Sequence, residues 1–273
     1  MLTRIITGLM LTIFILVPGV WFSHTFVLTL ICSVFSCIGV YEIVKCFGQK
    51  ANYAILIPSM ALALTMPTLV RYTFSGNSIY LMMTLMAVYT FYIFALPIFT
   101  NNEITFDDIA KTAMMSIYIS VGFSCIIMLR DLNDGQYLFI MAFLGAWITD
   151  IFAYFTGMLL GKHKLSPIIS PKKTVEGSIG GILLCTLSFV GYGCILNNFL
   201  EVNTNLILFA ILGFFASLVS QLGDLIMSAI KRKHDVKDYG TLFPGHGGVL
   251  DRFDSVIAVA PVLYLICYAT LLK

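Results

Sequence analysis

Two aspartates in the last quarter of the chain are candidates for metal-assisted phosphate chemistry. Asp224 lies in an apolar run, with Ser228 and Lys231 four and seven residues further on, so the three side chains share one face of a helix. Asp251 follows the glycine-rich segment PGHGG, where the next apolar run begins. Carboxylates, phosphate oxygens and waters are the ligands that Mg²⁺ prefers. Asp224 and Asp251 therefore predict a magnesium site.

The same part of the chain is dense in charge and glycine. Residues 228–255 hold five of the 16 Lys and Arg residues and four of the 14 Asp and Glu residues. Glycine amides at a turn can approach phosphate oxygens closely. The candidate phosphate-binding groups are the side chains of Ser228, Lys231, Arg232, Lys237 and Arg252, and the backbone amides of Gly247 and Gly248. His246 either donates a hydrogen bond to a phosphate or fixes the turn. A charged loop with internal salt bridges would explain the charge but not the glycines.

A third aspartate, Asp150, lies in the middle of an apolar run. A charge at the centre of a membrane helix costs about 2.5–3.5 kcal/mol, so such a residue normally faces the protein interior or a watery cavity. Tyr154, Gly157 and Gly161 follow at helical spacing and extend a polar, small-residue stripe from it. We expect Asp150 to belong to the site; the alternative is a hydrogen-bonded carboxylate that serves packing alone.

The segment SPIISPKKTVEG predicts a helix start with an anion site. Ser170 and Pro171 resemble an N-cap and a first helical residue. Lys172 and Lys173 would then lie in the first turn, where a positive charge is unfavourable unless an anion binds there. A basic loop that contacts anionic lipid heads is an equally good interpretation. The glycines at 177 and 181 form a GxxxG pattern, which predicts close helix packing.

The elements that must position these residues are membrane helices. The chain has 273 residues, of which 59% are hydrophobic and 11% charged, against about 25% charged in soluble domains. Apolar runs long enough to span a bilayer lie near residues 5–22, 25–45, 52–69, 78–99, 109–129, 136–160, 174–196, 205–230 and 250–272. We therefore predict an all-α polytopic bundle of about nine transmembrane helices, a single integral membrane domain over residues 1–273. Residues 1–135 would be generic N-terminal helices and 136–273 the catalytic half.

The distribution of basic residues predicts the orientation. With nine spans and a cytoplasmic N-terminus, 13 of the 16 Lys and Arg residues fall on the cytoplasmic side and three on the other. Cytoplasmic loops of membrane proteins carry such an excess. The candidate site would then face the cytoplasm, in the cell's inner or plasma membrane.

Two other groups of residues have simpler interpretations. Glu42 lies near the end of an apolar run with Lys45 close by, which is typical of an interfacial carboxylate; a functional carboxylate is the alternative. The seven cysteines form no CxxC pattern and fall mostly inside the apolar runs, so we expect neither a disulfide framework nor a zinc site.

Metal ligands, glycine amides and basic side chains at one membrane face suit phosphoryl or nucleotidyl transfer to a lipid head group. No Walker A motif is present, because GMLLGKH has one residue too few between its glycines and lacks the Ser or Thr.

The stretch from Ser228 to Asp254 resembles the signature of phosphatidate cytidylyltransferases: SAIKR, four residues, then KDYGTLFPGHGGVLDRFD. The segments TDIFAY, GKHKLSPIISPKKTVEG and SQLGDL are also similar to that family, and the resemblance covers about residues 147–255. It implies that CTP and phosphatidate react to CDP-diacylglycerol and diphosphate, with Mg²⁺ held by Asp224 and Asp251 and a second cation nearby. It also implies a many-helix membrane protein, a homodimer, in phospholipid synthesis.

Two other functions remain open at this point. A CTP-dependent lipid kinase, such as a polyprenol kinase, would use similar groups but transfer the γ-phosphate and release CDP. A transporter would also need carboxylates inside the membrane, but it would place essential acids on both sides and leave PGHGG unexplained.

Overall fold

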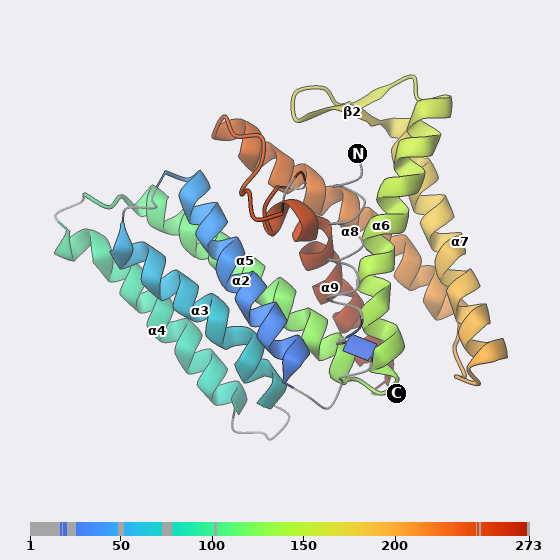
Figure 1. Ribbon diagram of the computed structural model, residues 1–273, viewed down its shortest axis with the longest axis horizontal. Coiled ribbons are helices and arrows are strands. Elements are labelled where there is room, and N and C mark those ends of the chain that lie inside the picture. Colours follow the sequence, from blue (N-terminus) through green and yellow to red (C-terminus); the bar gives the residue numbers. More distant parts are fainter. Residues whose placement is uncertain are drawn as a thin grey trace. The chain divides into compact units, whose positions relative to one another are not determined.

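The computed structural model describes residues 17, 19–20, 26–48, 52–72, 78–100, 103–243, 245 and 247–271. The long helices are α2 (Val27–Cys46), α3 (Tyr53–Tyr72), α4 (Ser78–Phe99), α5 (Phe106–Asp131), α6 (Gly135–Leu160), α7 (Val175–Phe199), α8 (Leu206–Lys233) and α9 (Leu250–Leu271) (Figure 1). Within this part of the chain, eight helices are long and apolar enough to cross a membrane. The chain is therefore an all-α polytopic membrane protein, as predicted. The predicted span at 5–22 lies almost wholly outside the described residues, so the count of nine and the orientation stay predictions.

A polar residue defines where α8 begins. The side chain of Asn205 caps α8, since its Oδ1 accepts hydrogen bonds from the backbone nitrogens of Ile207 (2.9 Å) and Leu208 (3.3 Å). These are two of the amides that have no partner inside a helix.

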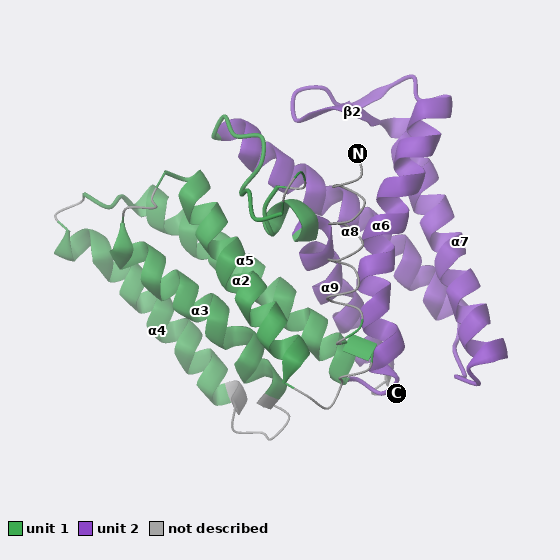
Figure 2. Cartoon of the chain, in the orientation of Figure 1, with its two compact units in different colours: residues 1–131, 234–253 green, residues 132–233, 254–273 purple. Residues whose placement is uncertain are grey.

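The chain folds as two compact units that do not follow sequence order (Figure 2). Unit 1 comprises residues 1–131 and 234–253, and unit 2 comprises residues 132–233 and 254–273. The glycine-rich segment before α9 therefore belongs to the same unit as α2 to α5. The division of the chain into a generic half and a catalytic half stays a prediction about activity.

In unit 1, helices α2, α3, α4 and α5 pack on one another. The shared core of α3, α4 and α5 is formed by Ile55, Leu62, Met66, Tyr89, Ile93, Leu96, Ile104 and Ile109. The Tyr89 hydroxyl is buried, and it lies 2.9 Å from the hydroxyl of Ser59, which satisfies it across α3 and α4. This unit is a membrane helix bundle whose interior is mostly apolar.

In unit 2, helices α6, α7 and α8 pack on one another through small residues. A Cβ atom on Gly177 would lie 2.6 Å from the Ala153 carbonyl oxygen, and one on Gly181 would lie 3.1 Å from the Ala153 Cβ. A Cβ on Gly145 would lie 2.9 Å from the Ala216 Cβ. These glycines are required for the close approach of the helices, so the packing role predicted for GxxxG is confirmed.

The predicted helix start at Ser170 is wrong. Residues Lys164–Ser166 form strand β1, which pairs antiparallel with β2 (Ser170–Thr174), and α7 begins only at Val175. Thr174 is the N-cap, because its Oγ1 accepts a hydrogen bond from the backbone nitrogen of Gly177 (3.1 Å). A two-stranded sheet has only edge strands, where a proline such as the one at 171 is tolerated. Lys172 and Lys173 therefore lie on a strand and not in a first helical turn.

Candidate active site

A cavity of about 460 Å³ opens in unit 2 where α6 ends and α7 begins. Its polar and small lining residues include Asp150, Tyr154 and Gly157 from α6, Lys164, Lys172 and Lys173 from the hairpin, and Ser178 and Gln221 from α7 and α8. Asp150 is exposed to this cavity, and Tyr154 and Gly157 lie on the same face of α6, as their spacing predicted. The Gln221 side chain is held by a hydrogen bond from its Nε2 to the Ser178 carbonyl oxygen (3.2 Å). The cavity brings one carboxylate and three lysines together.

Asp224 is tied to the hairpin by an ion pair. Its Oδ2 contacts the ammonium group of Lys173, and its Oδ1 accepts a hydrogen bond from the Ser228 hydroxyl (3.2 Å). The Asp224 and Lys173 side chains are each about 25% exposed, so the pair is only partly screened by water. The shared helix face predicted for Asp224 and Ser228 is confirmed. In this structure Ser228 and Lys173, both predicted to contact substrate, are partners of Asp224.

Three carboxylates act on one another in unit 2. Asp254 lies close enough to Asp224 and Asp150 for their negative charges to repel, and Lys231 offsets part of that repulsion. Asp150 in turn interacts with Asp224 and with Lys173. Asp254 was not among the predicted site residues, although its position three residues after Asp251 was a signal.

This excess of negative charge fits a bound cation. Among the described residues, no group of three or more His, Cys, Asp or Glu side chains is arranged to hold a metal ion. Mg²⁺ does not need such a group, because it commonly takes one or two carboxylates and completes its shell with water and substrate phosphates. The three carboxylates are therefore compatible with a metal that is bound together with a phosphate-bearing substrate, and the metal itself stays a prediction.

The glycine-rich segment of unit 1 folds tightly around Asp251. Oδ2 of Asp251 accepts hydrogen bonds from the backbone nitrogens of Tyr239 (2.8 Å) and Gly248 (2.9 Å). Gly247 has a φ of +84°, a backbone conformation that residues other than glycine rarely adopt. Its carbonyl oxygen accepts a hydrogen bond from the Phe243 nitrogen (2.9 Å). The Gly248 amide thus has a carboxylate partner, and its predicted contact with a phosphate stays a prediction. His246 lies outside the described residues.

Glu42 is not the interfacial carboxylate that its position suggested. The residue is 4% exposed. Its Oε1 accepts a hydrogen bond from the Val249 nitrogen (3.0 Å) and its Oε2 one from the Leu250 nitrogen (2.9 Å). These amides belong to the first turn of α9, where backbone donors lack helical partners. The prediction failed because the partners of Glu42 lie 207 and 208 residues away in the chain.

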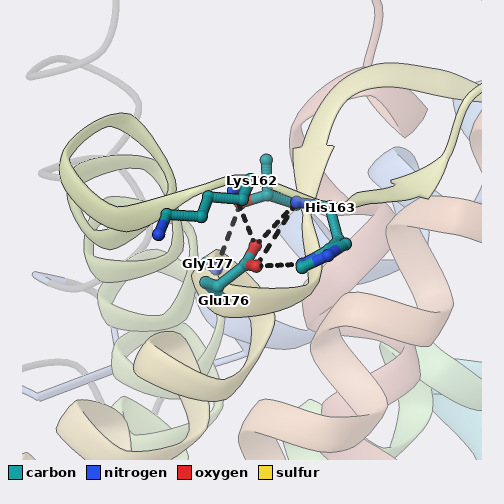
Figure 3. Close-up of polar contacts among 5 residues, drawn as sticks. Lys162, His163, Glu176 and Gly177 are labelled. Atoms are coloured by element: carbon teal, nitrogen blue, oxygen red, sulfur yellow. Dashed lines mark hydrogen bonds and ion pairs between the residues drawn. The ribbon is translucent and has the colours of Figure 1, made fainter.

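Glu176 fixes the entry to the hairpin, as Figure 3 shows. Its carboxylate accepts hydrogen bonds from the backbone nitrogens of Lys162 (3.1 Å) and His163 (3.2 Å), and its Oε1 lies 2.6 Å from Nδ1 of His163. This clamp joins the end of α6 to the first turn of α7 and so helps to orient the lysines of the hairpin. Local sequence patterns did not predict this clamp, because the partners of Glu176 lie 13 and 14 residues earlier in the chain.

The remaining predicted phosphate ligands differ in exposure. In unit 2, Lys231 is partly buried and Arg232 is exposed, both in the last turn of α8. In unit 1, Lys237 and Arg252 are exposed. Exposed basic side chains can reach a bound polyanion, but their roles stay predictions.

The fold and the cavity define a class: an integral membrane protein with a cavity lined by one carboxylate and three lysines. The chain matches the model of the Cytidylyltransferase family over residues 2–270, and it belongs to that family. The family resemblance inferred from the motif is thereby confirmed.

Several curated relatives are phosphatidate cytidylyltransferases. The one from Staphylococcus haemolyticus is 41% identical over 177 residues, which is 65% of this chain and 66% of the relative. The one from Staphylococcus epidermidis is 39% identical over 181 residues, 66% of this chain and 67% of the relative. The one from Staphylococcus aureus is 40% identical over 177 residues, with shares of 65% and 66%. The chain thus matches about two thirds of the length of these relatives.

Proposed function

We propose that this protein transfers the cytidylyl group of CTP to phosphatidate, giving CDP-diacylglycerol and diphosphate. The observation that carries the proposal is its membership of the Cytidylyltransferase family, with relatives that are phosphatidate cytidylyltransferases. The cavity of unit 2 supports it, since Lys164, Lys172 and Lys173 line it and can receive a phosphate. The eight apolar helices agree with a lipid substrate.

The proposed reaction is a single displacement at phosphorus. An oxygen of the phosphatidate phosphate attacks the α-phosphorus of CTP and forms a new P–O bond. The bond from the α-phosphorus to the bridging oxygen breaks, and diphosphate leaves with that electron pair. No general base is required, because a phosphate monoester has its second pKa near ~6 and is already largely ionised. Positioning and charge neutralisation then account for most of the catalysis.

Asp224 and Asp251 are the proposed metal ligands, and Mg²⁺ is the proposed metal. When bound, Mg²⁺ would neutralise charge on the triphosphate. Asp150 and Asp254, whose charges act on Asp224, would add to the attraction for a cation and suit the second cation that the family resemblance implies. Lys173 would compete with the metal for Oδ2 of Asp224, with which it forms an ion pair.

The basic residues divide between the two substrates in this proposal. Lys172 and Lys173 would hold the phosphate of phosphatidate. Lys231, Arg232, Lys237 and Arg252 would neutralise the triphosphate and the leaving diphosphate, with the Gly247 amide and His246 as further donors. The site would face the cytoplasm, where CTP is found, and the excess of basic residues on that side supports this orientation. We also propose a homodimer, on the family resemblance alone.

The test uses purified protein in detergent–phosphatidate micelles with α-labelled CTP and Mg²⁺. We expect label to enter lipid with an equal amount of diphosphate, and only when phosphatidate is present. Release of CDP with a prenol acceptor, without labelled lipid, would make the protein a lipid kinase. The Asp251→Asn variant is the control, since its side chain can keep its shape and an acceptor oxygen but loses the charge. We expect it to stay folded and to lose at least ~100-fold in turnover.

A further inference from the structure

The carboxylate of Glu42 is built into the segment that precedes Asp251. Glu42 lies on α2, in the part of the chain that carries no motif, and it is almost fully buried. Its two oxygens each accept one hydrogen bond, from two consecutive backbone amides at the start of α9. Burying a carboxylate costs free energy, which hydrogen bonds to the charged oxygens offset. Loss of either bond would leave one buried oxygen of Glu42 without a partner.

Two glycines of the segment leave room for this carboxylate. A Cβ atom on Gly240 or on Gly248 would collide with carboxylate oxygens of Glu42. Neither glycine is required there by a positive φ, since the glycines with positive φ in this segment are Gly245 and Gly247. Glu42 therefore explains why residues 240 and 248 are glycine, independently of any phosphate contact.

Glu42 and Asp251 accept hydrogen bonds from the same stretch of backbone. The amide of Gly248 donates to Asp251, and the next two amides, of Val249 and Leu250, donate to Glu42. Three consecutive donors are thus shared between two carboxylates. Because Asp251 follows directly after Leu250, any shift of this backbone also turns the Asp251 side chain.

We propose that Glu42 is a positioning residue, which fixes the first turn of α9 so that Asp251 presents its carboxylate in the geometry for metal binding. The proposal rests on the proposed function in one respect, namely that Asp251 is a metal ligand. It assigns a specific task to a helix of the N-terminal half. A role limited to core packing would require neither the two oxygens nor their separate amide partners.

The first experiment measures backbone hydrogen exchange in purified, metal-free protein. Gln keeps the shape of Glu42 but replaces one accepting oxygen with an NH₂ group, which would face a backbone donor. We expect Glu42→Gln to raise exchange at least about 10-fold at residues 248–251 and to leave α3 and α4 unchanged. The matched control is Glu103→Gln, because Glu103 is an exposed carboxylate of the same unit, and it should leave the exchange of every segment unchanged.

The second experiment measures Mn²⁺ binding by electron paramagnetic resonance, with Mn²⁺ as the probe for the metal. Outer partners that orient metal ligands typically contribute 10–100-fold in affinity, so Glu42→Gln should weaken Mn²⁺ binding about 10-fold or more. Glu103→Gln should bind as the unsubstituted protein does. In the activity assay, extra Mg²⁺ should restore part of the turnover of Glu42→Gln, which it could not do for protein that had merely unfolded.

Four results would overturn the proposal. One is unchanged exchange at 248–251 in Glu42→Gln. Another is faster exchange throughout unit 1 with unchanged Mn²⁺ affinity, which would make Glu42 a packing residue only. The third is full Mn²⁺ binding by Asp251→Asn, which would remove the metal role of Asp251 from the proposed function and the inference with it. The fourth is loss of the metal by Asp251→Asn but not by Glu42→Gln, which would refute the role of Glu42 and leave the metal role of Asp251 in place.

Discussion

Lys173 and Asp224 show how the charges of the site depend on one another. Their ion pair links β2 to α8, and Asp150 and Asp254 act on the same carboxylate. Removal of one member of a partly buried ion pair leaves the other charge without a partner. The resulting loss of stability is larger than the net stability that the intact pair contributes. Lys173 therefore affects both the lysine-lined cavity and the affinity of the aspartates for a cation.

The Lys173→Met variant tests this coupling. Loss of the ammonium group removes a phosphate donor and increases the net negative charge around Asp224. We expect the KM for phosphatidate to rise about 10-fold, as for loss of a charge-assisted hydrogen bond, and the half-saturating Mg²⁺ concentration to fall. Lys233→Met, which removes an exposed lysine at the end of α8, is the control and should change neither. A rise in both quantities for Lys173→Met would contradict the coupling.

Helical spacing was sufficient to predict which site residues of one helix share a face. The shared face of Asp224 and Ser228 and the exposure of Asp150 to a cavity follow from periods of three and four residues. Spacing could not reveal Glu42, the Glu176 clamp or the Lys173–Asp224 pair, because each joins segments that only the fold brings together. Asp254 could have been identified, since it is one helical turn from Asp251.

At the scale of elements, apolar length predicted the helices well and failed at the hairpin. Helices α4 and α6 end within one residue of the predicted runs at 78–99 and 136–160. In SPIISPKKT the serine–proline pair looked like a helix start, but Thr174 offers an equally good cap four residues later. Local capping preferences cannot decide between two such candidates, whereas the pairing of β1 with β2 does.

Packing of α6 against α7 provides a test with an internal control. Helix α7 contains Gly177, whose Cβ position is filled by the Ala153 carbonyl oxygen, and Gly191, which has open space around it. We expect Gly177→Ala to lower the thermal unfolding midpoint in detergent, because overpacking typically costs 1–3 kcal/mol. Gly191→Ala should leave it unchanged or raise it, since alanine favours a helix by about 0.5–1 kcal/mol. Equal effects of both variants would rule out the packing role.

At the scale of the whole molecule, neither compact unit is a continuous stretch of chain. Unit 1 takes residues 234–253 from the end of the sequence, and unit 2 takes the rest of α9. The predicted catalytic half, 136–273, therefore contributes to both units. Sequence order suggested a simpler division, because hydropathy alone identifies spans and carries no information about which of them pack together.

The proposed orientation is testable with single cysteines at the two ends of α8. Asn203 precedes this helix and Lys233 ends it, and both are exposed. We expect a membrane-impermeant maleimide to label Asn203→Cys in intact cells and Lys233→Cys only in inverted vesicles. The unsubstituted protein is the background control, because its seven cysteines are buried or partly buried. The reverse labelling pattern would place the candidate site on the outer face.

The distance in sequence between Glu42 and its partners also has a consequence for biosynthesis. At 5–20 residues per second, the 207 residues from Glu42 to Val249 take about 10–40 s to make. During that interval α2 is already in the membrane, and its carboxylate must be solvated by water or by temporary partners. A chain that stops before residue 249 keeps this carboxylate without its two backbone partners. Unit 1 can therefore reach its native packing only after the glycine-rich segment has been made.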